Sequence, residues 1–326
     1  MYRNRNVCVT GGAGFIGSHL CEALVRYGAN VTVIDDLSNG LRDNLAAIAD
    51  RIRFVEGSIL DPIALKAAFE GVEIVFHQAA IASVPRSVKE PVRYFEVNAT
   101  GTLRVLEAAR ASIQQHASAG GIRRVIYAAS SSAYGDRDEL PKVETMSPMP
   151  LTPYASAKFA GEHLLRTYCY CYGLSGVSLR YFNIFGPRQR PDSPYAAVIP
   201  RFAQAYLTGS KPVIFGDGLQ TRDFTFVENA VLANLLAGAS ENDLRGEVIN
   251  IACGERFTLL ELVNAIAQHL GVKPEYELAP PRLGEVRHSL ASIDAARQLI
   301  GYEPVVRFHE GLKITLNALM HDATMR

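Results

Sequence analysis

The chain has 326 residues, enough for two domains around a core that needs neither disulfides nor a structural metal ion. Basic and acidic residues number 33 each, so the net charge is zero and we expect no nucleic-acid partner. A hydrophobic fraction of 48% excludes a disordered chain, and no apolar run reaches the ~20 residues of a membrane span. Because no signal-peptide pattern precedes the first predicted strand, we expect a cytoplasmic protein with no membrane partner.

Short β-branched runs alternate with segments of helical periodicity through the first half of the chain. The runs occupy residues 7–10, 31–34, 52–55, 74–77, 125–128 and 177–181. Such alternation is typical of parallel strands joined by helical crossovers, and runs that are apolar on both faces indicate strands covered by helices on each side. We therefore predict an α/β fold with a Rossmann-type, doubly wound parallel sheet.

The regular alternation ends after Gly186, where prolines interrupt short elements. We predict a first domain over residues 1–185 and a smaller mixed α/β substrate lobe over residues 186–326. Segments near 223–254 are apolar enough to pack back onto the first domain. The boundary therefore need not be a single cut.

The five cysteines do not form a recognisable metal or redox motif. No two of them have the two-residue gap typical of zinc or thiol–disulfide sites. Cys169 and Cys171 are close in sequence, but they lie in a tyrosine-rich helical stretch without other ligands. We expect reduced thiols packed as small apolar side chains, and no metal site.

A glycine-rich turn follows the first predicted strand. Gly11, Gly14 and Gly17 allow a tight turn, close approach to a pyrophosphate and close packing of the next helix, whose first N–H groups face the anion. Asp35 and Asp36 end the second strand, where a carboxylate accepts hydrogen bonds from the adenosine ribose and repels a 2′-phosphate. The pattern predicts that the first domain binds NAD rather than NADP; a turn or helix-capping role is the alternative for Asp35.

A serine, a tyrosine and a lysine form a second pattern. The fifth strand runs into three serines that begin at Ser130, and Tyr154 and Lys158 follow with the spacing that puts both on one helix face. Moving a tyrosine pKa from ~10 to near 7 needs ~4 kcal/mol. The ammonium and a positively charged nicotinamide can supply it in a water-poor cleft. The pattern predicts a tyrosine base beside NAD.

With these residues, nearly the whole chain resembles the extended short-chain dehydrogenase/reductases, and within them the UDP-hexose 4-epimerases. The matching segments are Asn98 within residues 97–102, residues 179–187 and residues 221–224. Residues 83–87, 134–136 and 286–289 are similar to the subgroup that epimerises UDP-N-acetylglucosamine.

The resemblance implies three catalytic residues. Tyr154 is the base, Lys158 modulates it, and Ser130 holds the sugar 4-hydroxyl, with the register among the three serines open by one residue. The implied reaction is reversible inversion at carbon 4 of UDP-N-acetylglucosamine, through a 4-keto intermediate and with tightly bound NAD. UDP-glucose and UDP-galactose are further implied substrates.

The resemblance also implies the residues that contact NAD. At the adenine, this chain has Ser58 where relatives carry an aspartate, and Asp61 lies three residues on, so the contact is open between these two. The implied NAD-binding residues are Gly11, Gly14, Phe15, Ile16, Gly17, Asp35, Asp36, Ser38, Asn39, Gly40, Ser58, Ile59, Gln78, Ala79, Ala80, Asn98, Tyr154, Lys158 and Tyr181.

The implied substrate residues come mostly from the second lobe. Arg222 and Arg282 are expected to hold the diphosphate, because paired anionic groups require cationic partners. Small Ser289 is expected to leave room for a substituent on sugar carbon 2. The full implied set is Ser83, Val84, Arg86, Ser131, Ser132, Asn183, Ile199, Phe215, Arg222, Arg282 and Ser289.

Two other functions fit parts of the pattern. A nucleotide-sugar 4,6-dehydratase or decarboxylase needs an additional acid or base after the fifth strand, where this chain has Ser131 and Ser132. A catalytically silent NAD-binding protein is disfavoured because the tyrosine and the lysine are both present. The apolar helical segments 97–109 and 159–172 favour a homodimer surface, and packing against the sheet is the alternative for them.

Overall fold

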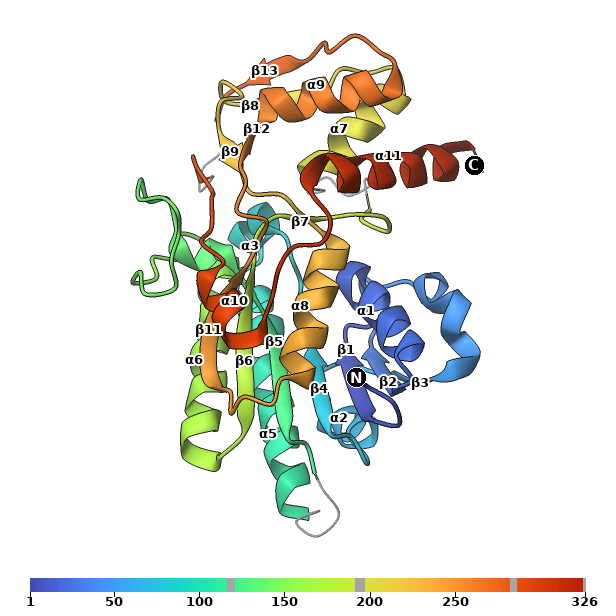
Figure 1. Cartoon of the computed structure of the whole chain (residues 1–326), viewed down its shortest axis with the longest axis vertical. Coiled ribbons are helices and arrows are strands. Elements are labelled where there is room, and N and C mark those ends of the chain that lie inside the picture. Colours follow the sequence, from blue (N-terminus) through green and yellow to red (C-terminus); the bar gives the residue numbers. More distant parts are fainter. Residues whose placement is uncertain (116–120, 191–196, 282–285, 325–326) are drawn as a thin grey trace.

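The structure is a computed structural model that describes residues 1–115, 121–190, 197–281 and 286–324. A large lobe is built on one sheet, and a smaller lobe is stacked on its end (Figure 1). The strands of the large sheet are β1 (Asn6–Thr10), β2 (Asn30–Asp35), β3 (Ile52–Glu56), β4 (Ile74–His77), β5 (Arg124–Ser130), β6 (Ser175–Tyr181) and β11 (Arg245–Ile251). All pairings within it are parallel, in the order β11-β6-β5-β4-β1-β2-β3. The predicted Rossmann-type, doubly wound α/β fold is confirmed.

Helices cover both faces of this sheet, and alternate residues of a strand contact different faces. Val7 and Val9 of β1 pack on one side, and Cys8 between them packs on the other. The first face is covered by α1 (Phe15–Arg26), η1 (Arg42–Arg51), α8 (Val227–Ala239) and α10 (Asp294–Ile300). The second face is covered by α2 (Pro62–Ala68), α5 (Gly101–Gln115) and α6 (Pro153–Tyr172). Burial on both sides explains why these strands are continuously apolar.

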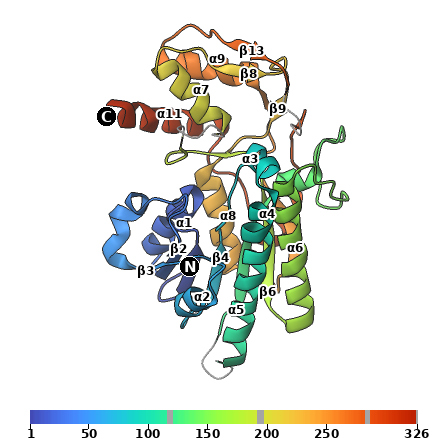
Figure 2. The same cartoon turned by 180° about the vertical axis from the view of Figure 1, so that it is seen from behind.

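The chain between β4 and α5 runs along the second face, as seen from behind in Figure 2. It forms α3 (Val84–Lys89), α4 (Pro91–Phe95) and the π-helical turn η2 (Glu96–Thr100). Prolines near the first positions of α3 and α4 fit the start of a helix, where an N–H group has no intrahelical partner. A short 3₁₀ turn, η3 (Ser131–Tyr134), follows β5 and carries the serines away from the sheet.

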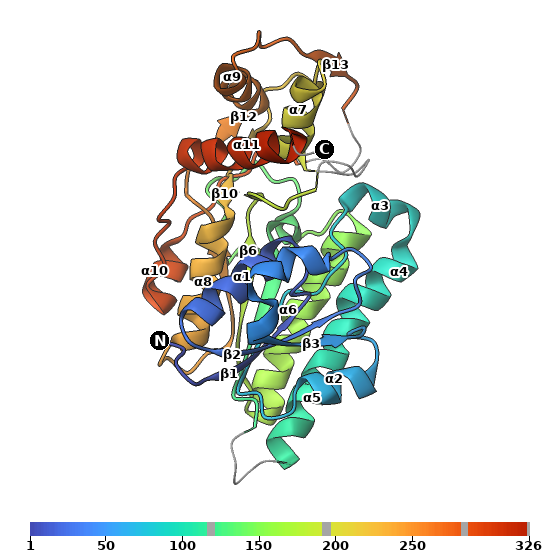
Figure 3. The same ribbon diagram turned by 90° about the vertical axis from the view of Figure 1, so that its right-hand side faces the viewer.

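The small lobe has its own aromatic core. Phe185, Phe202, Phe226 and Phe308 are buried together there. Figure 3 shows the lobe stacked on one end of the sheet. Its elements are β7 (Ile184–Phe185), α7 (Val198–Leu207), β8 (Val213–Phe215), β9 (Thr221–Arg222), β10 (Thr225–Phe226), β12 (Phe257–Thr258), α9 (Leu259–Leu270), β13 (Glu277–Ala279) and α11 (Phe308–Thr324).

Three elements that follow the predicted domain boundary, α8, β11 and α10, belong to the large lobe by their contacts. β11 extends the large sheet beside β6, and α8 packs on the same face as α1. The chain therefore returns from the small lobe to the large one before it forms α9. Within the described ranges, every helix is too short or too polar to span a lipid bilayer.

Candidate active site

A cleft lies at the carboxyl ends of the central strands, beside the glycine-rich turn, and we call it the glycine-turn cleft. A Cβ atom on Gly17 would lie 2.2 Å from the carbonyl oxygen of Gly11, and one on Gly11 would lie 2.6 Å from Cα of Ala79. Gly11 also has a φ of +70°. Helix α1 starts directly after Gly14, so its free N–H groups line the cleft. Backbone this closely packed fits the pyrophosphate of NAD.

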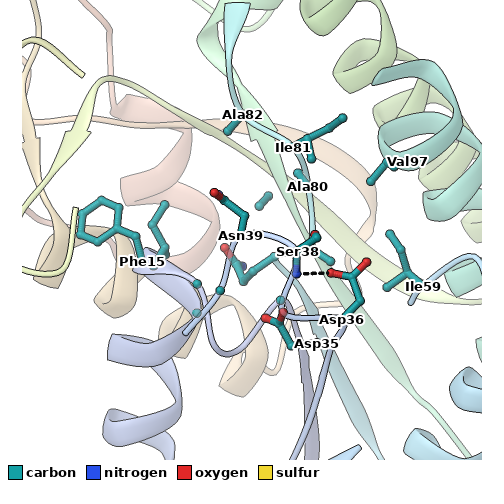
Figure 4. A pocket seen from close by; sticks show the side chains of 18 of the residues that line it. Phe15, Asp35, Asp36, Ser38, Asn39, Ile59, Ala80, Ile81, Ala82 and Val97 are labelled. Carbon is teal, nitrogen blue, oxygen red and sulfur yellow. Dashed lines mark hydrogen bonds between the residues drawn. The ribbon is translucent and has the colours of Figure 1, made fainter. Parts of the chain in front are cut away.

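The two carboxylates at the end of β2 have different surroundings. Asp35 is buried, and its oxygens accept hydrogen bonds from the N–H groups of Ala13 and Leu37, both at 2.9 Å. Burial raises the Asp35 pKa, although both hydrogen bonds act to lower it. Asp36 is exposed and accepts a hydrogen bond of 3.0 Å from the Ser38 N–H, drawn as the dashed line in Figure 4. Asp35 thus fixes the glycine turn, and Asp36 has a solvent-accessible carboxylate; both line the cleft.

At the far end of the cleft, the structure separates the two candidates for the adenine contact. Ser58 and Ile59 line the cleft, and Ile59 is buried. Asp61 does not line it: its side chain caps α2 by accepting the Ile63 N–H at 2.8 Å. The geometry therefore favours Ser58.

Three side chains from different elements, at or beside the cleft, are held in place by hydrogen bonds to one another. Gln78 donates to Asn234 at 2.9 Å, Asn234 donates to the hydroxyl of Tyr181 at 2.6 Å, and that hydroxyl donates to Gln78 at 3.2 Å. Gln78 and Tyr181 line the cleft, whereas Asn234 comes from α8, beyond the predicted boundary. The closed triangle leaves these side chains little rotational freedom.

Tyr154 and Lys158 lie on one face of α6 and both line the cleft. Interaction with Ser130 acts to lower the Tyr154 pKa, but burial outweighs it and raises the pKa. The Ser130 hydroxyl oxygen itself lies 2.8 Å from that of Ser132. Lys158 is 3% exposed, and burial lowers its pKa to about 7. Its ammonium nitrogen lies 4.5 Å from the ring centre of Tyr127.

Asn98 is the one predicted NAD residue that does not line the cleft. It is buried on η2, accepts a hydrogen bond from the Ile81 N–H at 2.9 Å and donates to the Ile81 carbonyl at 3.0 Å. Ile81 itself lines the cleft, as Figure 4 shows. Asn98 therefore positions the segment after β4. Small or apolar residues that the sequence analysis missed also line the cleft: Ile34, Gly57, Ile81, Ala82, Val97, Ala128 and Ala129.

A second cavity adjoins the cleft and contains Ser130, Ser131, Ser132 and Ser289; we call it the serine cavity. Ser289 is 8% exposed, and its N–H donates to the Thr221 carbonyl at 3.1 Å. This hydrogen bond attaches the segment around Ser289 to strand β9 of the small lobe. Five residues besides Tyr154 line both spaces: Phe15, Ile16, Ala82, Ala129 and Tyr181.

A third cavity lies in the small lobe, and we call it the phenylalanine cavity after Phe185, Phe215 and Phe224. Ile199, one of the implied substrate residues, also lines it. Asn183 and Arg222 line both this cavity and the serine cavity. The three spaces thus form a series in which neighbours share wall residues, as an extended dinucleotide next to a nucleotide sugar would require.

Some predicted substrate residues lie elsewhere. Ser83 caps α3 by accepting the Arg86 N–H at 3.3 Å, and the exposed Arg86 forms an ion pair with Glu90 at 2.8 Å. Neither Ser83 nor Arg86 lines any of the three spaces, although Val84 between them lines the serine cavity. Arg282 lies outside the described residues.

Several polar residues that the sequence analysis did not assign also line the serine cavity, among them Lys142, Gln189 and His288. Lys142 is 2% exposed and donates to the Arg137 carbonyl. Burial lowers its pKa. The Oε1 atom of Gln189 is buried without a hydrogen-bond partner among the described residues. These positions lie in loops without periodicity; His288 had a signal, since it belongs to the matched segment 286–289.

Residues 7–252 match the NAD dependent epimerase/dehydratase family. A UDP-glucose 4-epimerase from Mycolicibacterium smegmatis is 39% identical over 313 residues, covering 94% of this chain and 96% of that protein. A UDP-N-acetyl-alpha-D-glucosaminuronate decarboxylase from Bacillus cytotoxicus is 33% identical over 322 residues, covering 94% and 95%. These similarities extend over both lobes.

Two solved structures are similar over nearly the whole chain. A UDP-N-acetylglucosamine 4-epimerase from Methanobrevibacter ruminantium, in complex with UDP-N-acetylmuramic acid, has a TM-score of 0.91 at 38% identity. The match covers 98% of this chain and 99% of that one. A UDP-glucose 4-epimerase from Thermus thermophilus, in complex with NAD, has a TM-score of 0.86 at 36% identity and covers 97% and 99%.

Proposed function

The chain belongs to the NAD dependent epimerase/dehydratase family, and we propose that it interconverts UDP-N-acetylglucosamine and UDP-N-acetylgalactosamine by inverting sugar carbon 4. Its class is that of the NAD-dependent UDP-sugar 4-epimerases. The identity of the sugar is the part that we propose. Activity on UDP-glucose and UDP-galactose belongs to the same proposal. The homodimer and the cytoplasmic location stay predictions.

The observation that carries the proposal is the position of Tyr154. Its side chain lines both the glycine-turn cleft and the serine cavity, so it stands between the expected nicotinamide and the expected sugar. Ser130 lines the serine cavity with it and is near enough to act on the tyrosine pKa. A general base must lie within hydrogen-bonding reach of the proton it takes, and a hydroxyl bound at this junction meets that requirement.

When bound, NAD accepts a hydride from the sugar and returns it. Tyr154 takes the proton of the sugar 4-hydroxyl as the hydride leaves carbon 4, and gives it back when the hydride returns to the other face of the 4-keto sugar. Ser130 holds that oxygen throughout. Because burial raises the Tyr154 pKa, its phenolate form depends on nearby positive charge, which the Lys158 ammonium supplies.

Support for an acetylated sugar comes from Ser289. This small side chain lines the serine cavity, and its backbone is fixed to β9, so the space next to it is a property of the fold. An acetamido group is three heavy atoms larger than a hydroxyl. Ser289 provides for that volume where a bulky side chain would not.

A 4,6-dehydratase or decarboxylase is the second candidate, since one similar protein is a decarboxylase. Elimination requires an acid or base besides the tyrosine. The described residues that line the serine cavity include no aspartate or glutamate; Ser131 and Ser132 occupy the positions after β5. This lining favours epimerisation.

The proposal is tested by incubating the purified protein with UDP-N-acetylglucosamine, UDP-N-acetylgalactosamine, UDP-glucose and UDP-galactose separately and resolving the products. We expect the two acetylated sugars to interconvert without stoichiometric release of NADH. Accumulation of NADH in step with product would identify a dehydrogenase, and a 4-keto-6-deoxy product would identify a dehydratase. Conversion of the plain hexoses alone would contradict the substrate assignment.

A further inference from the structure

A buried row of charges lies behind the catalytic tyrosine. Glu162 follows Lys158 by one turn of α6, and both side chains are 3% exposed. The Glu162 carboxylate accepts two hydrogen bonds from Arg180 on β6, at 2.9 and 2.7 Å. The Arg180 guanidinium in turn lies 4.5 Å from the ring centre of Tyr134. Two cations and one anion are thus enclosed between α6 and the sheet.

Stability alone does not account for this row. Replacement of a buried ion pair by apolar groups of similar size is often neutral or stabilising, because desolvation offsets the attraction. Nor is the hydrogen bonding complete, since Nη1 of Arg180 has no hydrogen-bond partner among the described residues. A costly buried carboxylate next to a reactive lysine calls for a role in the reaction.

We propose that Glu162, held by Arg180, is a positioning residue whose carboxylate keeps Lys158 in the ammonium form beside Tyr154. The inference rests on the catalytic roles proposed above for Tyr154 and Lys158. Among the described residues, the Lys158 ammonium has no hydrogen-bond or ion-pair partner; its one direct polar contact is with the Tyr127 ring, 4.5 Å from the ring centre. Burial lowers the Lys158 pKa, and Glu162 is the charge that raises it.

The other groups near Lys158 cannot replace this carboxylate. The buried imidazole of His77 is held between Thr10 and Thr102 at 2.8 and 2.9 Å, and burial together with Lys158 lowers its pKa to about 3, so it is neutral near pH 7. Phenols and a cation lie on the nearest elements: Tyr127 on β5, Tyr154 on α6, and Arg180 and Tyr181 on β6. The carboxylates on other elements packed against α6 have other surroundings: Glu96 on η2 is exposed, Glu107 on α5 is bonded to Arg110, and Glu247 on β11 accepts the Arg245 N–H.

The test measures the Tyr154 phenolate directly, so it does not depend on which sugar is the substrate. The NAD-loaded protein is titrated with base while the ultraviolet absorbance of phenolate is followed, and the same titration of Tyr154→Phe is subtracted. In Glu162→Gln the ammonium loses its counter-charge, so we expect the Tyr154 phenolate to appear about one pH unit higher than in the parent.

Arg180→Met breaks the same ion pair from the other side and is expected to act in the opposite sense. It leaves the Glu162 carboxylate to Lys158 alone, which stabilises the ammonium, so the phenolate appears at lower pH. If Glu162→Gln does not fold, the double variant Glu162→Gln/Arg180→Met replaces it in the test. Both members of the ion pair are then removed, so neither is left as an unpaired buried charge. Its phenolate is expected to move in the direction of Glu162→Gln, because the carboxylate is lost.

Glu107→Gln is the matched control. Glu107 on α5 is bonded to Arg110 at 2.8 and 3.0 Å, so the control also removes a carboxylate that accepts two hydrogen bonds from an arginine. Because the Tyr168 hydroxyl donates to Glu107, the background is taken from Tyr154→Phe made in the same variant. We then expect no displacement of the Tyr154 phenolate midpoint. Midpoints that stay in place in both Glu162→Gln and Arg180→Met, or that move in the same direction, would overturn the proposal and leave the pair a structural role. A shift as expected without epimerisation of any UDP-sugar would instead contradict the proposed function alone.

Discussion

The glycine-turn cleft is built mainly from one stretch of chain, whereas the serine cavity is assembled from segments far apart in the sequence. Between the glycine turn and Ala82, consecutive strands and their first loops supply most of the cleft wall. The serine cavity joins the loop after β4, the turn after β5, the start of α6, the loop after β6 and the segment around Ser289.

This difference explains why the two spaces impose different constraints on the sequence. In the cleft, the backbone itself is the binding surface, so glycines at fixed spacing are required where a Cβ would collide. In the serine cavity, side chains provide the surface, and a loop position can be any residue that fits. The glycine-turn cleft can therefore be recognised in the sequence as a motif. The serine cavity cannot, because it depends on how the small lobe is placed.

Tyr154 belongs to both spaces, and its loss has the largest expected effect. Tyr154→Phe is expected to lower kcat by ~10²–10⁴-fold, the usual contribution of a general base, with UDP-sugar affinity within a few-fold of the parent. Steady-state turnover and equilibrium binding of the UDP-sugar check the two halves of this statement. A variant that retains most of its turnover would remove Tyr154 from the mechanism.

The second largest effect is expected from a substitution confined to the glycine-turn cleft. In Gly17→Ala the new Cβ would lie 2.2 Å from the Gly11 carbonyl oxygen, so the turn must shift. Such overpacking costs ~3 kcal/mol, which corresponds to roughly 100-fold weaker NAD binding. Gly14→Ala is the graded comparison, because its Cβ would lie 3.2 Å from the same oxygen and should weaken NAD binding less. Equal NAD dissociation constants for the two variants would contradict the proposed packing of the turn.

The sequence predicted the sheet and the cleft well because both depend on local patterns. Each of the six predicted strand runs lies in a strand, and β-branched residues with apolar faces on both sides are sufficient to indicate this. Asn98 shows the limit: its segment matched, but a buried side chain that bonds to the Ile81 backbone looks the same in sequence as a ligand contact.

The rest could not be predicted because it depends on tertiary contacts. Lys142 follows a proline in a loop, and nothing in its neighbours indicates that the fold encloses it beside Ser289. Glu162 and Arg180 are 18 residues apart, and only the packing of α6 on β6 makes them a pair. The placement of Asn234 beside Gln78 requires that the chain return to the large lobe in α8.

A change confined to the serine cavity should affect specificity rather than NAD binding. Ser289→Tyr fills space beside the expected carbon 2 substituent, at a cost of ~1–3 kcal/mol for the larger sugar. We expect the ratio of kcat/KM for UDP-N-acetylglucosamine to that for UDP-glucose to fall by roughly 5- to 150-fold. An unchanged ratio would show that this side chain does not border the substituent.

The smallest expected effect is a pH dependence of folding stability, and it comes from the buried side chain of His77 at the end of β4. The His77 pKa is lowered to about 3, mainly by burial, from an ordinary value of 6.5. Its contribution to stability is therefore full above pH 6.5 and is lost as the pH falls toward 3. One such group costs ~1.4 kcal/mol at about pH 5.5 relative to neutral pH.

His77→Gln, which keeps hydrogen bonds to Thr10 and Thr102 possible, should remove this part of the acid sensitivity. Urea unfolding at neutral and mildly acidic pH measures it, and His163→Gln on the exposed surface of α6 is the control. If the parent and His77→Gln lose equal stability on acidification, the His77 imidazole does not contribute to the acid sensitivity of the fold.

The most direct measurement of the central claim uses UDP-N-acetylglucosamine with deuterium at carbon 4. If the hydride leaves to bound NAD and returns to the other face of the same carbon, UDP-N-acetylgalactosamine forms with the deuterium still at carbon 4, and none appears in water. Mass spectrometry of the separated sugars reads this out. Deuterium found at carbon 6 or in the solvent, or no inverted product, would contradict the account.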